Sequence, residues 1–356
     1  MTTLHGLPYG ANSTGLRLDP RELLDAHGRE IDFGLLDAFA GRSIVSALDF
    51  SRDEVVELAK LAALLESTRV EMRKPLDGKI IITAFFEPST RTRLSFESAI
   101  ERLDGKVLSV PDGGMTGAAK GESLADIGEM FNTYGDAVVM RHTKTSSCDE
   151  IRTNLTLPLI NAGNGSGHHP SQALLDWYAL LKWRPALSLP SPSEDDRLHL
   201  AIIGTPGNMR AVKSFLHVAL KLPEAVRRIT VISEMADPFG SALRPEVEGS
   251  PVPVAVSHDL REHLDDLDVI YMNSIALLGD SYKQLDSKFR LTSASGLSPK
   301  TVVMHPLARR GELDTSLDGT DHNLYFAQAA GAVFSRQALL VSVFGRAEWL
   351  EDLLAT

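Results

Sequence analysis

Three hydroxyl and two guanidinium side chains crowd residues 89–93 of a segment that reads FFEPSTRTRLSFE from Phe85 to Glu97. The β-branched run before it, residues 79–85, is typical of a buried strand, and apolar side chains then recur at helical spacing from Phe96 to Leu103. The first turn of a helix has unpaired N–H groups and the positive end of the helix dipole, so added hydroxyl and guanidinium donors form a site for a phosphate. The alternative is an ordinary capped helix with two solvated arginines.

Strands and helices alternate around this turn. Ser51 and Glu54 match a capping box, which predicts a long helix over residues 52–70. Further elements are predicted near 79–85, 90–103, 106–110, 123–133, 136–140, 147–155, 157–162 and 170–183. This alternation predicts an α/β fold with two domains, each a mainly parallel sheet flanked by helices.

A stretch rich in Pro, Ser and acidic residues, 187–197, predicts a linker between the two domains. The first domain is predicted to span residues 43–186 and the second 198–333. Strands of the second domain are expected near 198–204, 228–232, 252–256, 267–272 and 301–304. Residues 1–42 show no sustained periodicity and are predicted to be an N-terminal extension.

Bulk composition excludes several classes of protein. The 356 residues carry 36 basic and 47 acidic side chains, a net charge of −11, which argues against a nucleic-acid surface. No apolar run is long enough to cross a membrane, and the first residues do not resemble a signal peptide. A single cysteine, Cys148, excludes an internal disulfide and fits a reducing compartment, so we expect a cytoplasmic protein.

Two other kinds of site are weakly supported. The turn from Gly204 to Arg210, GTPGNMR, lacks the third glycine of a dinucleotide-binding loop. His142, His168 and His169 do not have the spacing of a metal site. We therefore expect neither a metal nor a cofactor.

Five segments taken together resemble the aspartate and ornithine carbamoyltransferase family, nearest to the catalytic chain of its aspartate members. They are FFEPSTRTRLSFE at 85–97, TGAAKGES at 116–123, VVMRH at 138–142, NAGNGSGHHPSQALLD at 161–176 and VVMHPLARRGEL at 302–313. The resemblance covers residues 43 to 345 and implies the carbamoyltransferase fold, with a C-terminal helix over 334–353 that packs on the first domain. It also implies transfer of a carbamoyl group from carbamoyl phosphate to an amino-acid amine, with release of phosphate.

The resemblance assigns the residues of the donor site. It implies that the phosphate is held by Ser89, Thr90, Arg91 and Thr92, that Arg141, Thr92 and His169 contact the developing oxyanion, and that Gln172 and the Leu307 carbonyl bind the carbamoyl nitrogen. Such a reaction needs no covalent intermediate, since positioning and electrostatic stabilisation suffice. Where relatives have a proline after the leucine, preceded by a cis bond, this chain has Ala308; both a cis bond and a reshaped loop stay open.

Two residues have further implied roles. His169 precedes Pro170 at a predicted helix start, where the dipole disfavours a positive charge, so we hypothesise that it is a neutral donor; the alternative is a simple capping histidine. Thr116 and Lys120 match a loop that enters the neighbouring subunit's site, which implies a homo-oligomer, typically a trimer, with shared active sites. The alternative is a loop with a solvated lysine.

The second substrate is harder to assign. Arg210 matches the arginine that holds an acceptor's α-carboxylate. Aspartate-using relatives then read close to YMTR-x-Q-x-x-R, but this chain has Ser274, Ala276 and Gly279 at the charged and amide positions. A buried carboxylate needs charged partners, so we expect aspartate to be a poor acceptor.

On this reasoning a small acceptor with an α-carboxylate and a neutral or cationic side chain fits best. An example is a diamino acid such as 2,3-diaminopropionate, whose second ammonium pairs with Asp280. An ordinary aspartate carbamoyltransferase of pyrimidine synthesis, in which Lys283 supplies the missing charge, is the first alternative. A non-catalytic scaffold homologue is the second.

Overall fold

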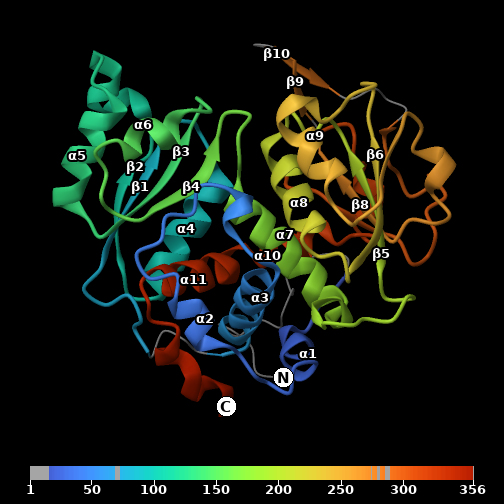
Figure 1. Ribbon diagram of the computed structural model, residues 1–356, viewed down its shortest axis with the longest axis horizontal. Helices are drawn as coiled ribbons and strands as arrows, with labels where there is room; N and C mark the ends of the chain where they lie inside the picture. The colour runs from blue at the N-terminus through green and yellow to red at the C-terminus, as the bar shows by residue number, and fades with distance from the viewer. Residues whose placement is uncertain (1–15, 69–72, 274, 279–280, 285–288, 356) are drawn as a thin grey trace. The chain divides into compact units, whose positions relative to one another are not determined.

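The chain folds into two compact units. The computed structural model describes residues 16–68, 73–273, 275–278, 281–284 and 289–355. Unit 1 comprises residues 16–26 with Leu175–Gly331, and unit 2 comprises His27–Leu174 with residues 332–355. Each unit has helices around a sheet (Figure 1). Among the described residues, no helix is both long and apolar enough to cross a membrane.

Unit 2 is built on a four-stranded parallel sheet with the strand order β2-β1-β3-β4. Its strands are β1 (Ile80–Phe85), β2 (Lys106–Val110), β3 (Ala137–His142) and β4 (Leu159–Asn164). Apolar side chains fill β1 and β3 because these inner strands are buried on both faces. The edge strand β2 is largely exposed and begins with a lysine.

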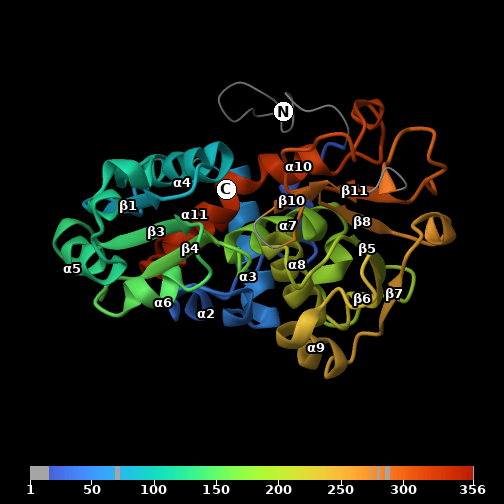
Figure 2. The same ribbon diagram turned by 90° about the horizontal axis from the view of Figure 1, so that it is seen from above.

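Helices cover both faces of this sheet. They are α2 (Phe33–Asp37), α3 (Arg52–Ser67), α4 (Thr90–Arg102), α5 (Leu124–Tyr134), α6 (Ser147–Arg152) and α11 (Ala332–Val343). Ile82 and Met140 of the sheet pack with Phe131 of α5 and Ile151 of α6. Figure 2 shows α4 on the other side of the sheet from α6, and α11 packs against α3 and α4.

The predicted long helix near residue 52 is confirmed. α3 begins at Arg52 because the Ser51 hydroxyl accepts a hydrogen bond from the Glu54 N–H at 3.2 Å. The Glu54 carboxylate accepts one in return from the Ser51 N–H at 2.6 Å. The helix ends at Ser67.

Unit 1 contains a five-stranded parallel sheet with the order β11-β8-β5-β6-β7. Its strands are β5 (Leu198–Ile203), β6 (Val226–Ile232), β7 (Val254–Ser257), β8 (Val269–Met272) and β11 (Val302–Met304). A separate antiparallel pair joins β9 (Ile275–Leu278) to β10 (Ser281–Gln284). Two parallel sheets flanked by helices confirm the predicted fold class.

Aromatic stacking anchors one face of the unit 1 sheet. The helices of unit 1 are α1 (Pro20–Asp25), α8 (Arg210–Leu220), α9 (Gly240–Glu248), α10 (Tyr325–Ala330) and the later part of α7 (Pro170–Trp183). The Phe215 ring of α8 stacks between Trp177 of α7 and Tyr271 of β8, with centroid distances of 5.5 and 4.2 Å. Alternate strand residues such as Ile270 face the opposite layer, which includes Phe289 and Leu313.

The prediction of one continuous amphipathic helix over residues 334–353 is wrong. α11 ends at Val343, Gly345 takes a left-handed φ of +61°, and the chain continues as a 3-10 helix over Glu348–Ala355. The Asp37 carboxylate stabilises this break by accepting a hydrogen bond from the Ala347 N–H at 2.6 Å. α11 is also buried on most sides, because it packs against α3 and α4.

The chain passes between the units three times: between α1 and α2, within α7, and between α10 and α11. The linker predicted at 187–197 and the domain limits at 43–186 and 198–333 stay predictions. Residues 16–42, predicted to belong to an extension, form α1 and α2, in which Leu23 and Leu36 are fully buried.

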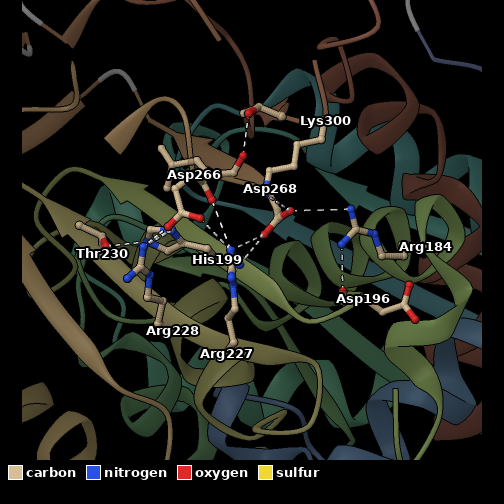
Figure 3. Close-up of polar contacts among 11 residues, drawn as sticks. Arg184, Asp196, His199, Arg227, Arg228, Thr230, Asp266, Asp268 and Lys300 are labelled. Atoms are coloured by element: carbon tan, nitrogen blue, oxygen red, sulfur yellow. Dashed lines mark hydrogen bonds and ion pairs between the residues drawn. The ribbon is translucent and has the colours of Figure 1, made fainter. Parts of the chain in front are cut away.

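A charged network occupies the amino ends of the unit 1 strands (Figure 3). Asp268 is 3% exposed and accepts a hydrogen bond from the His199 N–H at 2.8 Å. Its carboxylate also lies 3.5 Å from Arg227 and 3.3 Å from Lys300. Binding sites of parallel sheets form at the opposite, carboxyl ends of the strands, so this network fastens the strand starts together.

Candidate active site

The turn between β1 and α4 places the predicted phosphate residues on the first turn of a helix. α4 begins at Thr90, and Ser89 is its N-cap residue with an extended backbone, φ −158° and ψ 99°. The Ser89 hydroxyl does not cap the helix, so the first N–H groups retain their capacity to bind an anion. Arg91 is exposed, whereas Thr92 is only 7% exposed. The turn therefore offers amide, hydroxyl and guanidinium donors to one anion.

Arg141 lies near the end of β3, paired in register with Phe85 of β1. Its guanidinium donates a hydrogen bond to the Glu87 carboxylate at 2.6 Å and one to the Ala162 carbonyl at 3.4 Å. The Arg141 side chain is 12% exposed, and that of Glu87 is 19% exposed. The half-buried ion pair holds Arg141 beside the turn that carries Ser89. Glu87 was not predicted from the sequence, in which its only signal is an acidic residue two positions before Ser89.

Arg93 belongs to a different network from Arg91. Its guanidinium lies 3.4 Å from Glu97 and 3.5 Å from the Ser109 hydroxyl. The same Glu97 oxygen accepts hydrogen bonds from Thr83 at 2.9 Å and from Ser109 at 2.7 Å. Arg93 thus joins α4 to β1 and β2, and Arg91 is the exposed arginine of the pair.

Two buried asparagines shape the loop after β4. Asn161 is fully buried and donates hydrogen bonds to a backbone carbonyl at 2.8 Å and to Asn164 Oδ1 at 2.9 Å. Asn164 donates to the Thr145 carbonyl at 2.5 Å and accepts from the His168 N–H at 2.8 Å. These bonds fix the path of the chain up to His169. Neither asparagine was assigned a role from the sequence, although the NAGNG composition is a turn signal.

His169 lies immediately before α7, as expected from the proline that follows it. Its carbonyl accepts hydrogen bonds from the Gln172 N–H at 3.0 Å and the Ala173 N–H at 3.2 Å. The His169 side chain is 4% exposed, and Gln172 is 8% exposed. The Ser171 hydroxyl lies 3.4 Å from His169 Nδ1. Both side chains are therefore held at the start of a helix with little freedom.

One edge of the unit 2 sheet collects all of these groups. Ser89, Arg141 and His169 belong to the carboxyl ends of β1, β3 and β4, which are neighbours in a parallel sheet. Two 3-10 helices, Gly113–Met115 and Gly117–Lys120, follow β2; Thr116 lies between them, and Lys120 ends the second. The Thr116 hydroxyl donates to the Gly113 carbonyl at 2.7 Å, and Lys120 is exposed.

The remaining predicted residues belong to unit 1. Arg210 is the first residue of α8 and follows the turn after β5. Leu307 follows β11, has a φ of +52°, and forms a cis peptide bond with Ala308. Both therefore lie at the carboxyl edge of their sheet. Ser274 and Asp280 lie outside the described residues.

The histidines near the unit 2 site have protein partners. Across the described ranges, no group of three or more His, Cys, Asp and Glu side chains is placed to hold a metal ion. Burial and the nearby Lys144 lower the pKa of His142, whose Nδ1 accepts a hydrogen bond from the Lys144 N–H at 2.9 Å. His142 thus stabilises the chain after β3.

Family models match both halves of the chain. The carbamoyl-P binding domain of aspartate/ornithine carbamoyltransferase matches residues 42–182. The Asp/Orn binding domain of the same family matches residues 196–343.

Curated relatives and solved structures agree with these models. The aspartate carbamoyltransferase catalytic subunit of Methanothrix thermoacetophila is 36% identical over 306 residues, which cover 84% of this chain and 97% of the relative. The subunit of the same name from Chromobacterium violaceum is 35% identical over 305 residues, covering 84% and 96%. The aspartate transcarbamoylase of Trypanosoma cruzi, solved with carbamoyl aspartate and phosphate, has a TM-score of 0.75 at 30% identity and covers 86% of this chain and 97% of its own.

The expectation of an acceptor other than aspartate, such as a diamino acid, is wrong. Relatives that match over most of the chain are named aspartate carbamoyltransferase, and the similar structures are aspartate transcarbamoylases. The expectation equated the sequence offset from Met272 with a position in the site. Two of the three positions used for that expectation, Ser274 and Gly279, lie outside the described residues.

The two matched domains and the phosphate-type turn at the start of α4 lead to one assignment: this chain belongs to the aspartate/ornithine carbamoyltransferase family and is a carbamoyltransferase.

Proposed function

We propose that this protein is an aspartate carbamoyltransferase, which transfers the carbamoyl group of carbamoyl phosphate to the amine of L-aspartate and releases phosphate. The carboxyl edge of the unit 2 sheet carries the proposal. There the uncapped first turn of α4 follows β1, and Arg141 and His169 lie at the ends of the neighbouring strands β3 and β4. The names of the relatives support aspartate as the acceptor.

On this proposal, the donor is held by two kinds of contact. The first N–H groups of α4, with Ser89, Thr90, Arg91 and Thr92, bind the phosphate oxygens. Lys120 and Thr116 add further donors from the loop after β2. Gln172 and the Leu307 carbonyl accept hydrogen bonds from the carbamoyl nitrogen, and so orient the carbonyl carbon for attack.

The reaction proceeds by direct attack of the uncharged amine on the carbamoyl carbon. A carbon–nitrogen bond forms, a tetrahedral oxyanion develops, and the carbon–oxygen bond to phosphate then breaks while the amine passes a proton to the departing phosphate. Arg141, Thr92 and His169 stabilise the oxyanion, His169 as a neutral donor. Glu87 matters here because it holds the Arg141 guanidinium at 2.6 Å before substrate binds.

Two positions of unit 1 define the acceptor side. Arg210, at the start of α8, binds the α-carboxylate of aspartate by charge-assisted hydrogen bonds. The side-chain carboxylate needs a second cation, and Lys283 is the basic residue of β10. Aspartate is thereby distinguished from neutral amino acids by charge.

Phosphate release measured across a panel of amines tests this function. The panel contains aspartate, asparagine, 2,3-diaminopropionate, ornithine and a sample without amine, with an Arg91→Ala chain as the control for contaminating activity. We expect release with aspartate and a product of the mass of carbamoyl aspartate. Release with another amine but not with aspartate, or release without any amine, would overturn the proposal.

We further propose that the enzyme is a cytoplasmic homotrimer with shared active sites. The position of Lys120 supports active sites shared between subunits. Lys120 is exposed on a loop that follows the edge strand β2, where a neighbouring subunit can be reached. Sedimentation of the purified chain tests the trimer.

A further inference from the structure

A buried histidine and a buried glutamate bracket the turn that carries Leu307. His305 Nε2 lies 3.0 Å from Glu312 Oε1, and the two side chains are 1% and 2% exposed. His305 Nδ1 lies 2.8 Å from the Leu307 nitrogen. The Arg310 N–H donates to the same Glu312 oxygen at 2.8 Å. The turn is therefore tied at both sides to one pair of side chains.

These contacts determine which ring nitrogen of His305 carries the proton. The Leu307 backbone nitrogen can only donate, so Nδ1 must be the unprotonated acceptor. Nε2 then carries the hydrogen and donates it to Glu312. A proton on Nδ1 would face the Leu307 N–H and break that bond.

The charge on Glu312 agrees with this arrangement. Burial opposes its ionisation, but hydrogen bonds from His305 and from the Arg310 N–H keep the pKa of Glu312 below its usual value. The carboxylate is therefore an acceptor and cannot donate to Nε2.

The start of the turn is held as well, because the His305 N–H donates to Gln328 at 2.9 Å and Gln328 donates to Asp176 at 2.5 Å.

We propose that Glu312 is a positioning residue of the reaction: through His305 it fixes the Leu307 peptide, and thereby the Leu307 carbonyl that binds the carbamoyl nitrogen. This inference rests on the proposed function for the role of that carbonyl. Glu312 does not itself contact the substrate on this proposal. It acts through two successive hydrogen bonds, one to His305 and one from the Leu307 N–H to His305. Misplacing a carbonyl that orients the substrate lowers the rate without removing any group that contacts it.

Two substitutions of Glu312 distinguish its role as a hydrogen-bond acceptor from its contribution to packing. Glu312→Gln keeps an amide oxygen that both N–H donors can reach, whereas Glu312→Leu fills a similar volume without an acceptor. We expect kcat/KM for carbamoyl phosphate to stay within about fivefold of wild type in Glu312→Gln. In Glu312→Leu it should fall about ten- to a hundred-fold.

Asp268→Leu is the matched control, because Asp268 is also a buried acceptor of a backbone N–H but lies at the amino ends of the strands. It should lower Tm and leave kcat/KM within about fivefold of wild type. Wild-type kinetics in Glu312→Leu, equal losses in both Glu312 variants, or an equal loss in Asp268→Leu would each overturn the proposal.

A measurement on the unmodified protein remains decisive even if Glu312→Leu does not fold. Nitrogen NMR of a chain labelled at histidine and leucine should show His305 with unprotonated Nδ1 and protonated Nε2, and a coupling across the hydrogen bond to the Leu307 amide. A protonated Nδ1 would overturn the proposal. Absence of phosphate release with aspartate in the wild type would instead refute the proposed function, and this NMR result would still decide the hydrogen-bond chain.

Discussion

Arg91 and Arg93 are two residues apart in α4 and have different surroundings. Positions i and i+2 of a helix do not face the same way, so their guanidinium groups cannot serve one site equally. Arg93 contacts Glu97 and Ser109, while Arg91 is exposed in the first turn. The motif alone does not distinguish the two arginines, whereas these contacts do.

Replacement of Arg91 by alanine should therefore impair donor binding selectively. Loss of a charge-assisted hydrogen bond to phosphate typically costs about 1.5–3 kcal/mol, which corresponds to an increase in KM for carbamoyl phosphate of about ten- to a hundred-fold. Arg93→Ala is the matched control and should change KM by less than about fivefold, because Arg93 already bonds within unit 2. Initial rates of phosphate release measure both, and a larger effect for Arg93 would contradict this division of roles.

Cys148 should be unreactive in the folded protein. Its side chain is 4% exposed, and burial, with a contribution from Asp149, raises the pKa of the thiol to about 12. At pH 8 about one thiol in ten thousand is then ionised, and the thiolate is the reactive form. A thiol-reactive dye should label the native chain slowly and the denatured chain rapidly with one equivalent. Rapid labelling of the native chain would contradict this burial.

Individual site residues could be predicted from the sequence when they belong to a contiguous motif. The turn of Ser89 to Thr92 and the position of His169 before a helix both follow from local patterns. Glu87 and Glu312 could not be found in this way, because their contacts depend on the pairing of β1 with β3 and on the path of a loop. The acceptor was predicted wrongly because residue offsets after Met272 were used as if they were positions in a site.

At the scale of elements, helix starts were predicted better than helix ends. The Ser51 and Glu54 pattern placed the start of α3 correctly, since a capping box is formed by neighbours in sequence. The end of α11 was missed, because it depends on Gly345 and on a carboxylate from Asp37, more than three hundred residues away in the chain. The strands of the two parallel sheets were predicted from β-branched runs, whereas β9 and β10 were not predicted.

His199, at the amino ends of the unit 1 strands, should make the stability of the protein depend on pH. His199 is fully buried, with Nε2 2.8 Å from Thr230 and Nδ1 3.1 Å from Asp266 and 3.2 Å from Arg228. Burial first, and then the charge of Arg228, lower the pKa of His199 although Asp266 opposes the shift. Below the usual histidine pKa of about 6.5, the unfolded chain takes up a proton that the folded chain refuses, so stability falls as pH falls.

Chemical denaturation at pH 7.5 and 5.5 checks this dependence. The wild type should lose more stability over this interval than His199→Gln, by up to about 1.4 kcal/mol per pH unit below the unfolded-state pKa. Asp266 does not contribute in this window, because its pKa is lowered from 3.8 and its stabilisation is lost only at more acidic pH. Measurements at pH 7.5 and 8.5 are the control, where the two proteins should show equal slopes; equal slopes below pH 6.5 as well would contradict the prediction.

At the scale of the whole molecule, each of the two units has its own parallel sheet. Ser89, Arg141 and His169, which are proposed to bind the donor, lie at the carboxyl edge of the unit 2 sheet, and Arg210 and Leu307 lie at the carboxyl edge of the unit 1 sheet. Composition and alternation predict two such sheets, because each α/β unit must bury both faces of its parallel strands. They do not predict whether a loop from a second copy of the chain completes a site.

Mixing two inactive chains tests whether an active site uses two subunits. Lys120 lies on the loop after the edge strand β2, and Arg91 on the turn after β1. If each site combines Arg91 of one chain with Lys120 of its neighbour in a closed ring, an equal mixture of Lys120→Ala and Arg91→Ala chains restores about a quarter of the sites. Each variant alone should remain nearly inactive when carbamoyl phosphate is kept well below its raised KM.

The size of the recovery distinguishes the possible arrangements. A site built within one chain would recover nothing on mixing, because every chain lacks either Arg91 or Lys120. Lys106→Ala, which removes an exposed lysine from β2 itself, is the matched control and should be active without mixing. Native mass spectrometry must show mixed oligomers in the same sample; if they form and activity stays absent, the shared site is contradicted and Lys120 is a solvated loop residue.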